Sequence, residues 1–82
     1  MTDEQKQALS EAVWVDPKRL SGVPCFRGTR VPVQSLIDVL EGGETIDQFL
    51  QLYPAVTRKQ VWAVLDLANH QLVDCASSLT SA

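Results

Sequence analysis

The sequence predicts a mainly α-helical fold in which a short N-terminal β element precedes three helices. Apolar residues recur at helical spacing in three stretches, at 33–40, 46–53 and 61–75. Two Thr-x-x-Gln capping boxes, at 45–48 and 57–60, mark where the second and third of these helices begin. With 82 residues, the chain has the length of one small domain with a modest core.

Composition narrows the class of protein. The chain is 45% hydrophobic and 21% charged, has a net charge of −3, and contains no run of about 18 apolar residues that could span a membrane. The N-terminus lacks the basic start and apolar core of a secretory signal. We therefore expect a cytoplasmic protein in which Cys25 and Cys75 stay reduced. Those two cysteines and the single histidine, His70, exclude a closed four-ligand zinc site, and we expect no cofactor.

The β element is predicted at residues 12–15, Ala-Val-Trp-Val, where an Asp-Pro turn then stops the run. A second extended region, 23–33, contains two prolines, so it is expected to be an edge strand or an isolated ribbon. It turns at Gly28, which we expect to adopt a positive φ. Residues 1–11 are expected to be a flexible N-terminus with at most a loose helical turn, and 77–82 a frayed tail, which leaves 12–76 as the domain.

Proline and glycine punctuate the helices. Pro32 suits the first position of the first helix, which runs until Gly42-Gly43. The second helix opens at the first capping box and closes before Pro54. The long third helix carries a predicted core stripe of Val61, Val64, Leu65, Ala68, Leu72 and Cys75.

Apolar residues outside that stripe predict self-association, most simply as a homodimer. Trp62 and Leu67 lie off the stripe, so the long helix has a second surface to cover. The β-prone run also leaves an unpaired edge. The candidate interface with a second copy or another partner is therefore Val13, Trp14, Val15, Trp62 and Leu67.

The short helix, the turn around Pro54 and the long helix form a helix-turn-helix candidate. The first exposed residues of the long helix would then face a major groove, its N-cap threonine would hold the helix start, and two arginines of the basic segment 17–32 would contact the DNA backbone. The candidate DNA-binding residues are Arg27, Arg30, Thr57, Arg58, Lys59 and Gln60. The alternatives are a solvated surface, or an arginine that ties down an acid such as Asp16 or Asp38.

No catalytic grouping emerges, so we do not expect an enzyme. His70 has Asp66 and Asp74 four residues away on either side, but no nucleophile lies within reach of a triad. A surface histidine that interacts with its helical neighbours is the better interpretation.

An ordered series of motifs carries a resemblance to a known family. The motifs are Asp16-Pro17, Gly22-x-Pro24, Arg27-Gly28-Thr29-Arg30-Val31-Pro32-Val33, Leu40-x-Gly42-Gly43, Tyr53-Pro54 and Thr57. From Val13 to about Ala68 the chain resembles the DUF433 family. The resemblance implies a homeodomain-like helix-turn-helix and a bacterial antitoxin role, similar to VapB antitoxins of type II toxin–antitoxin pairs. It also implies two partners, a PIN-type ribonuclease toxin and operator DNA. Since little chain follows Cys75, neutralisation of a toxin would use the folded surface or the N-terminal strand.

Two hypotheses of different classes follow. The first is an antitoxin that binds a toxin and its own operator DNA. The second is a small dimeric protein-interaction module that never touches DNA.

Overall fold

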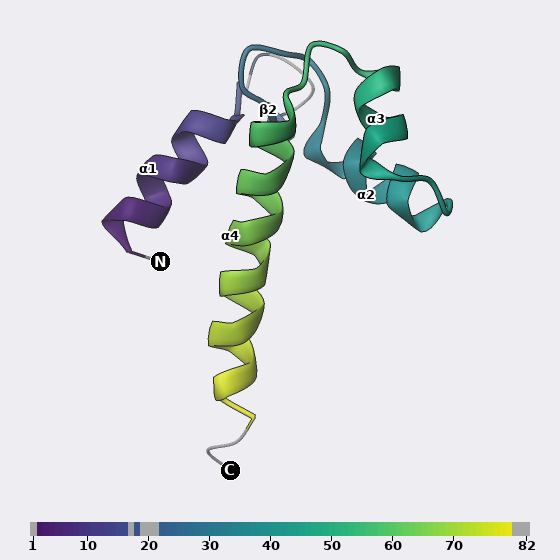
Figure 1. The fold of residues 1–82 in the computed structure, drawn as a ribbon. Helices are drawn as coiled ribbons and strands as arrows, with labels where there is room; N and C mark the ends of the chain where they lie inside the picture. Colours follow the sequence, from purple (N-terminus) through teal and green to yellow (C-terminus); the bar gives the residue numbers. More distant parts are fainter. Residues whose placement is uncertain (1, 17, 19–21, 80–82) are drawn as a thin grey trace.

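A computed structural model describes residues 2–16, 18 and 22–79 (Figure 1). Pro17 of the predicted turn, Arg19 of the basic segment and residues 80–82 of the expected tail lie outside the described residues. The element order is α1 (Asp3–Ala12), β1 (Val13–Trp14), β2 (Cys25–Phe26), α2 (Val33–Glu41), α3 (Ile46–Leu52) and α4 (Arg58–Ser77). The mainly helical class with a small β element is therefore confirmed, and α1 adds a helix to the three expected.

The elements gather around one end of α4. In Figure 1, α1 lies on one side of the upper part of α4, while α2 and α3 pack together on the other side. The lower part of α4 extends past all of them toward the C-terminus. Among the described residues, no helix combines the length and the apolar character needed to cross a bilayer.

Helix α1 departs from the expected flexible N-terminus. It begins with a capping box in which the Gln5 amide donates to Thr2 Oγ1 at 3.2 Å, and the Thr2 amide donates to Gln5 Oε1 at 2.9 Å. These contacts satisfy two amides that a helix start otherwise leaves without partners. The helix also packs against α4 and buries Ala12, which gives it the tertiary support that a ten-residue helix needs.

The β element is a two-stranded antiparallel ribbon. Val13 pairs with Phe26 and Trp14 pairs with Cys25, so the predicted run at 12–15 and the extended region after Val23 do meet. Both strands are only two residues long. The prolines explain this length, because Pro24 directly precedes β2 and Pro32 lies opposite Cys25 as an isolated bridge, and neither supplies an amide hydrogen to a longer ladder.

Helices α2, α3 and α4 begin and end close to where the sequence predicts. Pro32 is the N-cap of α2, one position before the first helical residue where it was expected. Both predicted capping boxes are formed, at Thr45 and at Thr57. Helix α3 ends at Leu52, just before the Tyr53-Pro54 pair.

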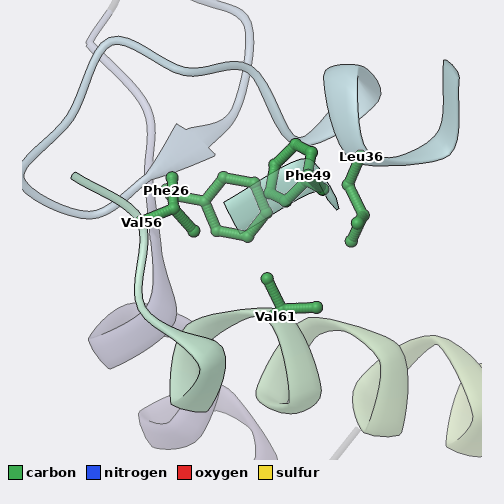
Figure 2. Close-up of a cluster of buried hydrophobic side chains, with 5 residues drawn as sticks. All are labelled: Phe26, Leu36, Phe49, Val56 and Val61. Atoms are coloured by element: carbon green, nitrogen blue, oxygen red, sulfur yellow. The ribbon is translucent and has the colours of Figure 1, made fainter. Parts of the chain in front are cut away.

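The core takes one side chain from each of β2, α2, α3 and α4 and one from the turn that precedes α4. Its fully or nearly fully buried members are Phe26, Leu36, Phe49, Val56 and Val61 (Figure 2). The rings of Phe26 and Phe49 pack with their centroids 5.9 Å apart, and Tyr53 lies 5.1 Å from Phe49 on the other side. This cluster holds α3 and the start of α4 in place relative to β2 and α2.

The predicted core stripe of α4 is only half right. Val61 is fully buried, and Val64 and Leu65 are partly buried against the core, but Ala68, Leu72 and Cys75 are exposed. The reason is length: α2 and α3 reach only the first two turns of a helix that runs for 20 residues. Every residue from 68 to 79 is exposed, and we call this segment the projecting end of α4.

Candidate interaction surfaces

The Gly-Thr-Arg loop, residues 27–31, is a structural junction. The Thr29 amide donates to the Phe26 carbonyl at 3.0 Å, and Gly28 between them has a φ of +78°, as a type II turn requires. The positive φ predicted for Gly28 is therefore confirmed. A strand-like bond closes the loop, because the Phe26 amide donates to the Val31 carbonyl at 3.0 Å.

Thr29 is the one polar residue that the described part of the chain buries. Its hydroxyl donates to the Phe26 carbonyl at 2.8 Å and accepts from the Val31 amide at 3.0 Å. Its carbonyl accepts from Trp14 Nε1 at 2.9 Å. The threonine thus satisfies the backbone of the loop from inside and ties the loop to β1.

Arg27 connects the loop to two helices. Its amide donates to the Ala12 carbonyl at 2.9 Å, and its Nε donates to the Ser10 carbonyl, so both groups hold the end of α1. Its carbonyl accepts from Gln60 Nε2 at 3.0 Å, which attaches the start of α4. One of the five N–H groups of the guanidinium that was expected to contact a DNA phosphate is therefore used by a carbonyl near the C-terminal end of α1.

Most of the other predicted DNA-binding side chains have structural partners as well. Thr57 and Gln60 form the capping box of α4 with bonds of 3.1 and 2.9 Å, and Gln60 uses its remaining amide hydrogens on Arg27. Arg58 forms an ion pair with Asp47 of α3. This partner was not expected, since Asp16 and Asp38 were the acids considered as partners of the basic residues.

Arg30 and Lys59 are exposed, as are Arg27 and Arg58. Lys59 lines a depression of about 300 Å³ between α1 and α4, together with Ala8, Glu11 and Ala63. Helix α1 therefore lies beside the first turn of α4 and brings a carboxylate to the face that would have to approach DNA. A phosphate backbone gains little from a lysine that shares its surroundings with an acid.

The predicted partner residues do not form one surface. Val13 and Trp14 belong to the ribbon and are partly buried, while Val15 and Trp62 are exposed. Leu67 is 7% exposed, so little of it is left for a partner. It is covered because α1, which the sequence analysis left flexible, packs on this side of α4.

A groove that the sequence analysis missed lies beside Leu67. It has a volume of about 260 Å³ and is lined by Leu9 and Val13 from the N-terminal elements, Pro24 and Val33 from the middle of the chain, and Val64 and Leu67 from α4. It also reaches Ala68 and Gln71, where the projecting end of α4 begins. No ionisable side chain lines it.

The apolar surface continues from the groove onto the projecting end. Leu72 is 67% exposed and Leu79, in the turn after α4, is 78% exposed. With Cys75 they follow the spacing of one helix face. The sequence analysis assigned Leu72 and Cys75 to the core and Leu79 to the frayed tail, so this exposed stripe could be recognised only from the structure.

The carboxylate–imidazole pair predicted at His70 is a surface contact. His70 Nε2 lies 3.5 Å from Asp66 Oδ2, and both side chains are more than half exposed. Cys75 is an exposed free thiol on the same helix, and Cys25 is a buried one. The exposed contact between His70 and Asp66 supports the interpretation of His70 as a histidine that interacts with its helical neighbour.

Comparison with known protein families finds one whose model matches most of the chain. The model of the family described as "Protein of unknown function (DUF433)" matches residues 13–68. The chain belongs to the DUF433 family. A search of curated proteins and a search of solved structures each found no match.

The DUF433 match follows the structure closely. It covers β1, the Gly-Thr-Arg loop, the core helices and the first half of α4. It leaves out α1 and residues 69–79 of the projecting end. The motifs that carried the resemblance are thus largely the residues that build the core junction, so they bear on the fold more than on a function.

Proposed function

We propose that the chain acts by binding another protein through the groove and the projecting end of α4. The observation that carries this proposal is the exposure of Leu72, Cys75 and Leu79 on consecutive turns, continuous with a groove free of charge. Apolar surface of this extent is typical of a protein interaction site. An amphipathic helix is the ligand that such a groove suits.

The specific form of the proposal is an antitoxin. Its partner would be a PIN-type ribonuclease, the partner expected from the motifs in the sequence. The surface that neutralises the toxin would be the folded groove and helix, in place of a disordered arm. Binding would also order the last turns of α4, which no other element supports.

Operator binding is the second candidate. The α3–turn–α4 arrangement and the exposed Arg30 and Lys59 favour it, and it would require a homeodomain-like use of α4. Against it stand the structural contacts that the side chains of Arg27, Arg58 and Gln60 already make. We therefore place protein binding first and DNA binding second.

One experiment separates the two candidates. The chain is co-expressed with the product of the neighbouring gene, and complex formation is measured by size-exclusion chromatography with light scattering. Leu72→Asp should abolish the complex, whereas Val73→Asp, which adds the same charge at an exposed position outside the apolar stripe, should preserve it. Equal behaviour of the two variants would refute the proposed surface.

DNA binding is measured in parallel by fluorescence anisotropy on a fragment of the chain's own promoter at low salt. Protein binding alone predicts no shift, with or without the partner. A shift that disappears in the double variant Arg58→Glu/Lys59→Glu, with the melting temperature unchanged, would establish the second candidate instead.

A further inference from the structure

The exposed part of α4 has two different sides, one that carries charged residues and one that is apolar. Its acidic residues and its histidine after the first turn, Asp66, His70 and Asp74, are each four positions apart and therefore form a row on one side of the helix. Four uncharged residues at helical spacing, with Ala68 as the first, lie on the opposite side. We call this second side the apolar strip; its members are Ala68, Leu72, Cys75 and Leu79.

We propose that the apolar strip and the groove are covered by the same surface of a second copy, with the two α4 helices antiparallel. This inference rests on the surface used in the proposed function and names a second copy as the occupant of that surface in the free protein; a neighbour-encoded partner would bind by displacing that copy. The resulting pair is two-fold symmetric, so each copy offers both a groove and a projecting end.

Charge favours an identical partner. The chain carries a net charge of −3, so two copies repel each other wherever their acids meet. Neither the apolar strip nor the groove contains an acidic or basic residue, and the acids of α4 point away from both. A second copy can therefore approach this face without placing like charges opposite each other. A basic partner would gain its attraction from the opposite face of the helix.

The positions of the two features set the direction of pairing. The groove lies along the part of α4 that precedes Gln71, and the projecting residues Leu72, Cys75 and Leu79 follow it. Only an antiparallel arrangement brings the projecting end of one copy to the groove of the other. The two-fold axis then passes near Gln71, and both grooves are filled at once.

Buried area points the same way. A specific dimer needs about 1,000 Å² of total buried surface. The antiparallel pair covers the helix from Val64 to Leu79, about 24 Å on each copy, together with the walls of both grooves. A parallel pair would cover only the projecting ends, about 18 Å, and would leave both grooves open to water. The antiparallel pair therefore covers more of each copy than the parallel pair does.

Oligomeric state is the first test. Sedimentation velocity of the full chain at micromolar concentration should give a species of twice the 9.0 kDa monomer mass. Leu72→Asp should raise the dimer dissociation constant about 100-fold or more, because the charge enters the interface twice. Val73→Asp is the matched control, since Val73 is 58% exposed on the neighbouring side of the helix, and it should leave the dimer intact. A monomeric wild type, or equal loss in both variants, would overturn the inference.

Direction of pairing is the second test. With the axis near Gln71, the two Cys75 residues lie about 12 Å apart along the helices, beyond the reach of a disulfide. Mild oxidation should therefore leave the wild-type dimer without an intermolecular disulfide. In a Cys75→Ser background, Gln71→Cys should instead be crosslinked across the axis by a short bismaleimide. Complete oxidation of wild-type Cys75 to a disulfide would show a parallel pair and contradict the proposal.

The outcomes separate this inference from the proposed function. If the wild type is a monomer but Leu72→Asp still abolishes the complex with the neighbour-encoded protein, the surface stands and the second copy is wrong. If the wild type is a Leu72-dependent dimer that binds no neighbour-encoded protein, the second copy is the correct occupant and the proposed function is wrong. Circular dichroism of both Asp variants should match the wild type, because Leu72 and Val73 contribute nothing to the core.

Discussion

Gly28 offers the sharpest test of how the Gly-Thr-Arg loop is built. Its φ is +78°, and a Cβ added there would meet nothing within 4 Å. The cost of a side chain is therefore a backbone cost alone. An L-residue in the left-handed region loses about 1–2 kcal/mol, and a β-branched residue loses more. Gly28→Val should consequently lower stability by about 2–3 kcal/mol, more than any charge reversal in the basic segment.

Gly42 is a matched control that isolates the backbone cost at Gly28. Gly42 caps α2 with a φ of −74°, and its added Cβ would make only ordinary contacts, at 3.4 Å from the Val39 carbonyl and 3.5 Å from the Asp38 carbonyl. Alanine at either glycine reduces the freedom of the unfolded chain by a similar amount, about 0.4–1 kcal/mol. That contribution cancels when Gly28→Ala is compared with Gly42→Ala. The two variants should then differ in free energy of unfolding by about 1–2 kcal/mol, which is the cost of a side chain on a left-handed backbone.

The assay is thermal unfolding followed by circular dichroism, at one protein concentration because a dimer melts in a concentration-dependent way. For a domain of this size, about 1 kcal/mol corresponds to a shift of about 4–8 °C. Gly28→Ala should therefore melt at least about 4 °C below Gly42→Ala. Gly43, with a φ of +87° and equally open space, should behave like Gly28. Equal melting temperatures for the Gly28 and Gly42 variants would refute the reasoning.

The remaining predictions concern the contacts around this loop. Thr29→Val keeps the shape of a buried side chain but leaves the Val31 amide without its acceptor. Chemical denaturation should therefore show that the free energy of unfolding falls by about 1–3 kcal/mol, and Thr29→Ser should recover most of that loss. Phe49→Ala removes the ring between Phe26 and Tyr53 and should cost about 3–5 kcal/mol, enough to leave the chain largely unfolded by circular dichroism at 37 °C. Arg58→Ala breaks an ion pair whose side chains are 56% and 71% exposed, so the free energy of unfolding should change by less than about 1 kcal/mol; a larger loss would mean that the Asp47 contact holds α3 in place.

Local signals were sufficient for most of the helical boundaries. The two Thr-x-x-Gln boxes and the glycine and proline breaks lie within a few residues of the groups they satisfy or restrict, so they act whatever the rest of the chain does. The positive φ of Gly28 could likewise be predicted from the local sequence. Helix α1 was open to the same reasoning, because Thr2 and Gln5 repeat the Thr-x-x-Gln pattern; the sequence analysis applied it only at positions 45 and 57.

The roles of the basic residues depended on distant parts of the chain. Arg27 donates to Ser10, seventeen positions away, and its carbonyl accepts from Gln60, thirty-three positions away. Nothing in the local sequence separates such an arginine from one that contacts phosphate, since the same guanidinium geometry suits both acceptors.

The sequence by itself determined where most of the helices start and stop, which residue takes a positive φ, and that α4 carries more apolar surface than one core face requires. Only the tertiary structure decided which part of that surface is covered. Leu67 and Leu72 are the same residue type on the same helix, yet α1 packs on the side of the first, and no element reaches the second. Burial is set by the elements that arrive from elsewhere in the chain, whereas helical spacing records only which residues share a face.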